Sequence, residues 1–133
     1  TQVKKVAAAV DAGLSVIEKA CVGKADMLLV HHGLFWGEPF SITGSLAEKI
    51  YRLQSSRCCL FASHLPLDGH LEVGNGAVLG RLLGLEEISG FCPHKGMTVG
   101  IKGRLSTGLS RGALSKRVFD IVKGPKPLEL FFG

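Results

Sequence analysis

The stretch that most constrains the fold is an apolar run that ends in two adjacent histidines. Residues 27–30 read Met-Leu-Leu-Val and are followed by His31, His32 and Gly33. Four consecutive apolar residues that end at a turn signal predict a short strand buried on both faces, as in a parallel sheet. Because side chains alternate along a strand, two neighbours at its end are expected to diverge toward two different points. Gly33 lets the backbone turn sharply there.

Strands and amphipathic helices alternate along the first 85 residues of the chain. Apolar segments that predict strands alternate with segments whose apolar residues recur at helical spacing. Ser45 and Glu48 are expected to form a capping box at the start of the second helix. This βαβαβα order predicts an α/β protein, a three-layer sandwich with a mostly parallel sheet. The expected strands span residues 3–10, 27–30 and 58–62, and the expected helices span 13–21, 45–53 and 77–83.

The last third of the chain is expected to begin a second α/β unit. We therefore place one βαβαβα metal-binding unit at residues 1–92 and the start of a second, truncated unit at residues 93–133. The expected elements are an irregular connection at 91–94, a half-exposed strand at 99–105, a helix at 110–123 and the start of a strand at 126–132.

Composition narrows the class of protein. The chain has 133 residues and a net charge of +5, but its basic residues are scattered, so nucleic-acid binding is not favoured. Its four cysteines form no CxxC pair, which favours reduced thiols in a cytoplasmic protein. No apolar run approaches the roughly 20 residues needed to cross a bilayer, and no leader is evident. The chain starts at Thr1 and ends in an apolar segment, which is typical of a fragment.

Ionisable side chains follow three consecutive strands of the predicted sheet. Asp11 follows the first strand, His31 and His32 end the second, and His64 with Asp68 follows the third. The carboxyl ends of parallel strands lie at one edge of a sheet, so these groups are expected near one another. A single histidine there is more often structural, but this combination favours a metal site. Asp11 is either an acceptor for a ligand histidine or a cap for the following helix.

Three other features carry weaker signals. Glycines in residues 74–80 resemble a dinucleotide fingerprint only faintly, because the spacing is wrong and they do not directly follow a strand. Cys92 and His94 are too few to make a metal site by themselves. Phe35 and Trp36 either stack on a flat ring or, more commonly, pack under a loop or at a subunit contact.

Two motifs resemble those of the Nif-three-like family, whose members are often labelled type-two GTP cyclohydrolase homologues. The first is Val-His-His-Gly-Leu-Phe-Trp-Gly at residues 30–37, and the second is Ser-His-Leu-Pro-Leu-Asp at residues 63–68. Both motifs are similar to those of the short bacterial branch. The resemblance runs along the whole chain and implies that an initial segment and a C-terminal half are missing.

The resemblance implies a site for two divalent transition metal ions, which could be zinc, iron, manganese, cobalt or nickel. Residue by residue, His31, His32 and Asp68 match the metal ligands of the family, whereas His64 matches a histidine near the metals that is not assigned as a ligand. The family draws further ligands from a later histidine-and-glutamate motif that this chain lacks, so its site is expected to be incomplete. The resemblance also implies a ring-shaped homohexamer.

Two classes of function follow from these expectations. The first is a metal-dependent hydrolase that acts on a small heterocyclic or phosphate-bearing molecule, with catalytic residues that the sequence does not identify. The second is a non-catalytic metal-binding or regulatory hexamer, whose basic surface could hold nucleic acid. The chain has no P-loop and no evident guanine-binding residue, so the family label alone is weak support for a reaction on GTP.

Overall fold

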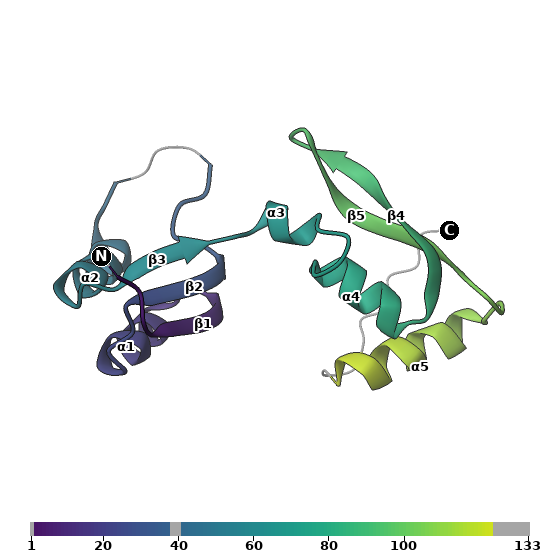
Figure 1. Ribbon diagram of the computed structural model, residues 1–133, viewed down its shortest axis with the longest axis horizontal. Coiled ribbons are helices and arrows are strands. Elements are labelled where there is room, and N and C mark those ends of the chain that lie inside the picture. The colour runs from purple at the N-terminus through teal and green to yellow at the C-terminus, as the bar shows by residue number, and fades with distance from the viewer. Residues whose placement is uncertain (1, 38–40, 124–133) are drawn as a thin grey trace. The chain divides into compact units, whose positions relative to one another are not determined.

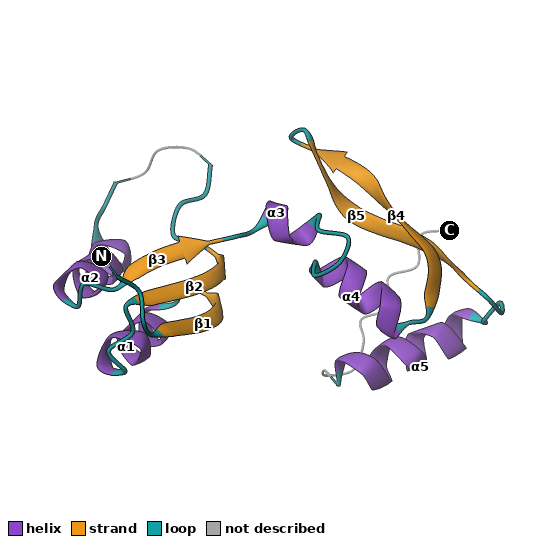
Figure 2. Cartoon of the chain, in the orientation of Figure 1, coloured by secondary structure: helices purple, strands orange, loops and turns teal. Residues whose placement is uncertain are grey.

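The computed structural model describes residues 2–37 and 41–123, which form two compact units, Thr1–His64 and Leu65–Gly133. Figures 1 and 2 show the elements of each unit. The first unit contains β1 (Val6–Asp11), α1 (Leu14–Val22), β2 (Met27–His32), α2 (Gly44–Ser55) and β3 (Cys59–Ala62). The second contains α3 (Leu65–Asp68), α4 (Asn75–Leu82), β4 (Leu85–His94), β5 (Met97–Leu105) and α5 (Arg111–Val122). The assignment of domains to residues 1–92 and 93–133 stays a prediction.

A parallel three-stranded sheet forms the centre of the first unit. Its strand order is β1-β2-β3, and Ala9 pairs with Val30, which pairs with Ala62. The register therefore places the carboxyl ends of all three strands at one edge of the sheet, as Figure 1 shows. The predicted α/β class and parallel pairing are confirmed.

Helices α1 and α2 cover the same face of this sheet. Ile17 of α1 and Leu53 of α2 belong to one buried cluster with Leu28 and Val30 of β2. Leu29 points to the other face and is 39% exposed, so the prediction that β2 is buried on both faces is wrong for this residue in the described structure. The second helical layer of the predicted sandwich stays a prediction.

The start of α2 differs from the expected capping box. Thr43, in an extended conformation, precedes the helix, and no side chain there accepts a capping hydrogen bond. The helix thus begins before Ser45, which lies inside its first turn rather than at the capping position. The carboxylate of Glu48 instead accepts a hydrogen bond from Nε of Arg52, at 2.7 Å. The predicted capping box is therefore wrong.

An antiparallel hairpin of β4 and β5 forms the centre of the second unit, and α4 packs against it. Residues 91–94 belong to β4, so the irregular connection expected there is wrong. Pro93 fits because, among the described strands, β4 pairs with β5 alone, and a proline can sit on an edge strand without losing a ladder hydrogen bond. The predicted helix at the position of α5 and strand at β5 are confirmed, while the strand expected at 126–132 lies outside the described residues.

The glycine-rich segment at 74–80 has a packing role. A Cβ atom at Gly74 would lie 2.4 Å from the carbonyl oxygen of His70, and one at Gly80 would lie 2.9 Å from Cδ1 of Ile101. These glycines allow the chain before α4, and α4 itself, to approach their neighbours closely. In residues 2–37 and 41–123, no helix is long and apolar enough to span a membrane.

Candidate metal centre

Two strand ends of the first unit bring three histidines together. His31 and His32 are the last residues of β2, and His64 follows the end of β3 by two residues. Because Val30 pairs with Ala62, the chain leaves β2 and β3 at the same level of the sheet. Gly33 lies against Ala62, where an added Cβ atom would come within 3.0 Å of the alanine side chain. The close approach at Gly33 therefore helps to keep the two strand ends adjacent.

The three imidazole rings converge. One nitrogen from each of His31, His32 and His64 lies within 4.8 Å of the other two. The ring centroids of His31 and His32 are 4.6 Å apart, and that of His64 is 4.8 Å from the first and 5.1 Å from the second. Within the described chain this is the one group of three or more side chains that could hold a metal ion.

The donor set fits a divalent transition metal. Three imidazoles with an open fourth position are a known ligand set for catalytic zinc, and imidazole also suits iron, nickel and copper. Nitrogens around one tetrahedral ion with bonds of about 2.0–2.1 Å lie about 3.3 Å apart. Small side-chain rotations would thus suffice for the three histidines to hold one ion.

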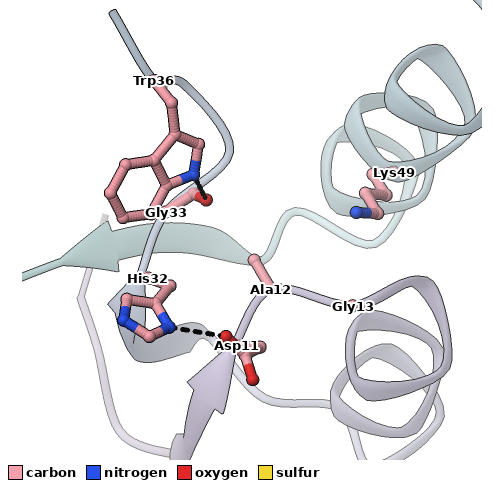
Figure 3. A pocket seen from close by; sticks show the side chains of 7 residues that line it. All are labelled: Asp11, Ala12, Gly13, His32, Gly33, Trp36 and Lys49. Atoms are coloured by element: carbon pink, nitrogen blue, oxygen red, sulfur yellow. Dashed lines mark hydrogen bonds and ion pairs between the residues drawn. The ribbon is translucent and has the colours of Figure 1, made fainter.

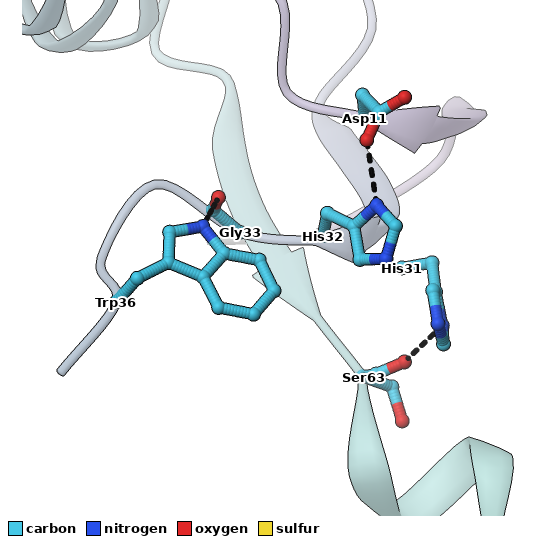
Figure 4. Close-up of polar contacts among 6 residues, drawn as sticks. All are labelled: Asp11, His31, His32, Gly33, Trp36 and Ser63. Atoms are coloured by element: carbon cyan, nitrogen blue, oxygen red, sulfur yellow. Dashed lines mark hydrogen bonds and ion pairs between the residues drawn. The ribbon is translucent and has the colours of Figure 1, made fainter.

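Asp11 orients the ring of His32. Its Oδ1 atom lies 2.6 Å from Nδ1 of His32, and Asp11 pairs with His32 in the β1–β2 register. Figure 4 shows this contact. A carboxylate that accepts the Nδ1 proton fixes the tautomer, so Nε2 becomes the nitrogen that would hold a metal. The residue before α1 is Gly13, with no side-chain cap, so the alternative role of Asp11 as a helix cap is wrong.

A backbone carbonyl orients the ring of His31 in the same way. Nδ1 of His31 lies 3.0 Å from the carbonyl oxygen of Ser63, one residue before His64 (Figure 4). This contact links the end of β2 to the segment after β3. As for His32, it assigns Nε2 as the metal-binding nitrogen of His31. The rings of His31 and His32 therefore both have protein acceptors that select the same tautomer.

Trp36 packs beside the histidines. Its indole N–H donates a hydrogen bond to the carbonyl oxygen of Gly33, at 3.0 Å, and its ring centroid lies 4.9 Å from that of His64. The centroid of His32 is 5.6 Å away. Trp36 is nevertheless 50% exposed, so part of the indole faces solvent next to the cluster.

The other residues singled out in the sequence belong to the second unit. Asp68 ends α3 in the second unit, where its Oδ1 atom accepts a hydrogen bond from Nδ2 of Asn75 at 3.1 Å. Its assignment as a metal ligand stays a prediction. Cys92 and His94 lie on β4 and join no group of three potential ligands among the described residues. His64, which the resemblance places near the metals without making it a ligand, is a member of the histidine cluster.

A cavity adjoins the cluster on the side of His32. It has a volume of about 350 Å³ and is lined by Asp11, Ala12, Gly13, His32, Gly33, Trp36 and Lys49. Figure 3 shows Lys49 of α2 across from His32 and Trp36, with its nitrogen toward the space between them. The sequence does not single out Lys49, because no local pattern distinguishes it from other helical lysines.

The fold and the cluster define an α/β protein with a candidate histidine metal centre. The sequence model of the family described as Duf34/NIF3 (NGG1p interacting factor 3) matches residues 1–130. The chain therefore belongs to the DUF34/NIF3 family, in agreement with the resemblance found in its motifs.

Curated relatives and solved structures support this assignment. The chain is 44% identical over 129 residues to a protein of Halobacterium salinarum named "GTP cyclohydrolase 1 type 2 homolog", covering 96% of this chain and 51% of the relative. A protein of the same name from Deinococcus radiodurans is 38% identical over 117 residues, which cover 88% and 44% of the two chains. The crystal structure of TTHA1606 from Thermus thermophilus matches with a TM-score of 0.79 and 41% identity, over 96% of this chain and 50% of that one. The chain thus spans about half the length of these relatives.

Proposed function

We propose that the intact protein is a metal-dependent hydrolase that acts on a small molecule at a site for two divalent transition ions. The convergence of His31, His32 and His64 at the edge of a parallel sheet carries this proposal. The sequence-based prediction adds the carboxylate of Asp68 as a further ligand. When bound, such ions lower the pKa of a bound water and polarise a substrate oxygen.

The chain's own residues have supporting tasks in this proposal. Asp11 and the carbonyl oxygen of Ser63 hold two imidazoles in the tautomer that directs Nε2 toward a metal. The indole of Trp36 packs against His32 and His64, which restricts their rotation and limits the access of water from that side. The neighbouring cavity supplies space for a small substrate.

The names of the relatives point to the same reaction class. Several are called homologues of a GTP cyclohydrolase, an enzyme name that denotes hydrolytic ring opening. Shared family membership is an argument by analogy, so the substrate has to be found by experiment.

Turnover by the metal-loaded protein tests the proposal. The intact protein would be loaded separately with Zn²⁺, Mn²⁺, Co²⁺, Ni²⁺ and Fe²⁺ and offered a panel of phosphoesters, nucleotides and pterin precursors. We expect hydrolysis of at least one class, with the activity abolished by a chelator and by His32→Ala. Stoichiometric metal without turnover on any member would contradict hydrolysis and support the alternative, a metal-binding or regulatory role.

A further inference from the structure

The cavity beside His32 has walls of three kinds. The backbone of residues 12–13, between β1 and α1, lies on one side. An imidazole and an indole, from His32 and Trp36, form a second wall, and the side chain of Lys49 forms a third (Figure 3). The volume of about 350 Å³ falls at the lower end of the range typical of small-molecule sites.

Among the described residues, Lys49 is the one cationic side chain that lines this cavity. It is half-buried, and it forms no hydrogen bond or ion pair with any other described residue. Arg52, three residues further along α2, differs because its guanidinium contacts Glu48 at 2.7 Å and Glu18 at 3.5 Å. The charge on Arg52 is thus satisfied within the protein, whereas that on Lys49 faces the cavity. A partly buried ammonium next to apolar and aromatic walls favours an anionic ligand.

Asp11, the acidic residue that lines the cavity, does not form an ion pair with Lys49. The carboxylate of Asp11 binds Nδ1 of His32 at 2.6 Å, so it is committed to orienting that ring. His32 lies both in the wall of the cavity and in the histidine cluster, so a molecule in the cavity lies directly beside the metal centre. The indole of Trp36 offers an apolar face to the body of such a molecule.

We infer that this cavity binds the oxyanion group, phosphate or carboxylate, of a small ligand, with Lys49 as the residue that holds the charge. As a subsite for the substrate, it rests on the proposed function. It narrows the substrate class to small anionic molecules, with the oxyanion at Lys49, the body against Trp36 and the reacting part toward the histidines.

Binding of three matched probes to the intact protein tests this inference. Phenylphosphonate, benzoate and phenol share one ring and differ in charge, and none of them can be consumed by hydrolysis. Calorimetric titration of the metal-free and the zinc-loaded protein would measure each Kd. We expect at least one of the two anions to bind in both forms and phenol to bind much more weakly, and the tighter anion identifies which oxyanion the site prefers.

Substitutions of Lys49 test whether the anionic probes bind in this cavity. Lys49→Met should weaken anion binding about tenfold or more, because a charge-assisted hydrogen bond is lost, whereas Lys49→Arg should stay close to the wild type. Lys19→Met, an exposed position on α1 outside this cavity, makes the same charge change and should have no effect. Trp36→Phe should weaken the binding of all three probes, whose shared phenyl ring packs on the indole, without abolishing the preference for an anion.

Two outcomes would overturn the inference. One is an unchanged Kd for the anions in Lys49→Met, and the other is phenol binding as tightly as the anions. The test of anion binding at Lys49 can fail or succeed independently of the test of hydrolysis. Lys49-dependent binding without turnover supports the subsite and contradicts hydrolysis, whereas turnover of anionic substrates with a KM that is unchanged in Lys49→Met contradicts the subsite alone.

Discussion

His32 depends on Asp11 for its orientation, which makes Asp11 a positioning residue for the metal centre. The two side chains meet at 2.6 Å across paired positions of β1 and β2. Asp11→Asn should weaken zinc binding about 10- to 100-fold, as is typical when such an acceptor is changed, because the tautomer of His32 is no longer fixed. Competition with a chromogenic chelator would measure the Kd.

A carboxylate of the same unit provides the control for this prediction. Asp26 comes just before the first residue of β2, at the opposite end of this strand from the histidines, and it accepts hydrogen bonds from backbone N–H groups before β1. Asp26→Asn should therefore leave the zinc Kd unchanged. Equal zinc affinity in Asp11→Asn and the wild type would show that Asp11 does not act through His32.

Site residues that lie in a local sequence motif could be predicted, whereas residues whose role depends on contacts between distant segments could not. His31 and His32 were identified because an apolar run leads directly into them, and the motif around His64 follows the next strand. Lys49 was missed because its importance comes from its place opposite His32, which is a tertiary relation. The sequence left the role of Asp11 open between two alternatives, and only the β1–β2 register decides for the contact to His32.

The elements of the first unit are predictable because hydrophobic periodicity dominates there. β1, α1, β2, α2 and β3 all lie where apolar runs or helical repeats predict them. The failures occur where tertiary context overrides local signals. Residues 91–94 read as irregular because of Pro93, yet hairpin pairing extends β4 through them. The four-residue helix α3 is too short to produce a periodic pattern.

The carboxylate of Asp26 links the turn before β2 to the residues that precede β1. Asp26 accepts hydrogen bonds from the backbone N–H groups of Lys4 and Lys5, at 2.9 and 2.8 Å. These bonds hold the pKa of Asp26 below its ordinary value of 3.8. Because the pKa of Asp26 is lower in the folded state than in the unfolded state, its carboxylate stabilises the fold at pH values above the unfolded-state pKa. This contribution is lost as the pH falls through the folded-state pKa.

Asp26→Asn should therefore lower the Tm at neutral pH. The difference in Tm from the wild type should shrink as the pH is lowered below 3.8, because the carboxylate that makes the bonds becomes protonated. Thermal unfolding followed by circular dichroism from neutral pH down to pH values below 3.8 would measure both curves. A difference that grows on acidification would contradict this account of Asp26.

At the scale of the whole molecule, we propose that the intact protein is a homo-oligomer, and the family resemblance points to a hexamer. The loop after β2 exposes two aromatic side chains, Phe35 at 65% and Trp36 at 50%, and exposed aromatic residues are common anchors of subunit contacts. The sequence also makes Phe40 a candidate for this contact, but Phe40 lies outside the described residues. Because the chain spans about half the length of its relatives, the assembly has to be tested on the intact protein.

Light scattering coupled to size-exclusion chromatography tests the assembly. We expect a mass of several subunits at micromolar concentration, and Phe35→Ser should reduce it, since the anchor is replaced by a small polar side chain. Leu71→Ser, at a position of the second unit that is also 50% exposed, serves as the control and should leave the mass unchanged. A monomeric wild-type protein under these conditions would contradict the proposal.

The most direct test of the metal centre is the metal content of histidine variants of the intact protein. Elemental analysis after purification with Zn²⁺ would compare the wild type with His31→Ala, His32→Ala and His64→Ala, with the exposed His94→Ala as the control. We predict that each of the three cluster variants loses most of its bound metal while the circular dichroism spectrum is unchanged, and that His94→Ala keeps the wild-type content. Metal content that is unchanged in all three cluster variants would contradict the assignment of this cluster as a metal centre.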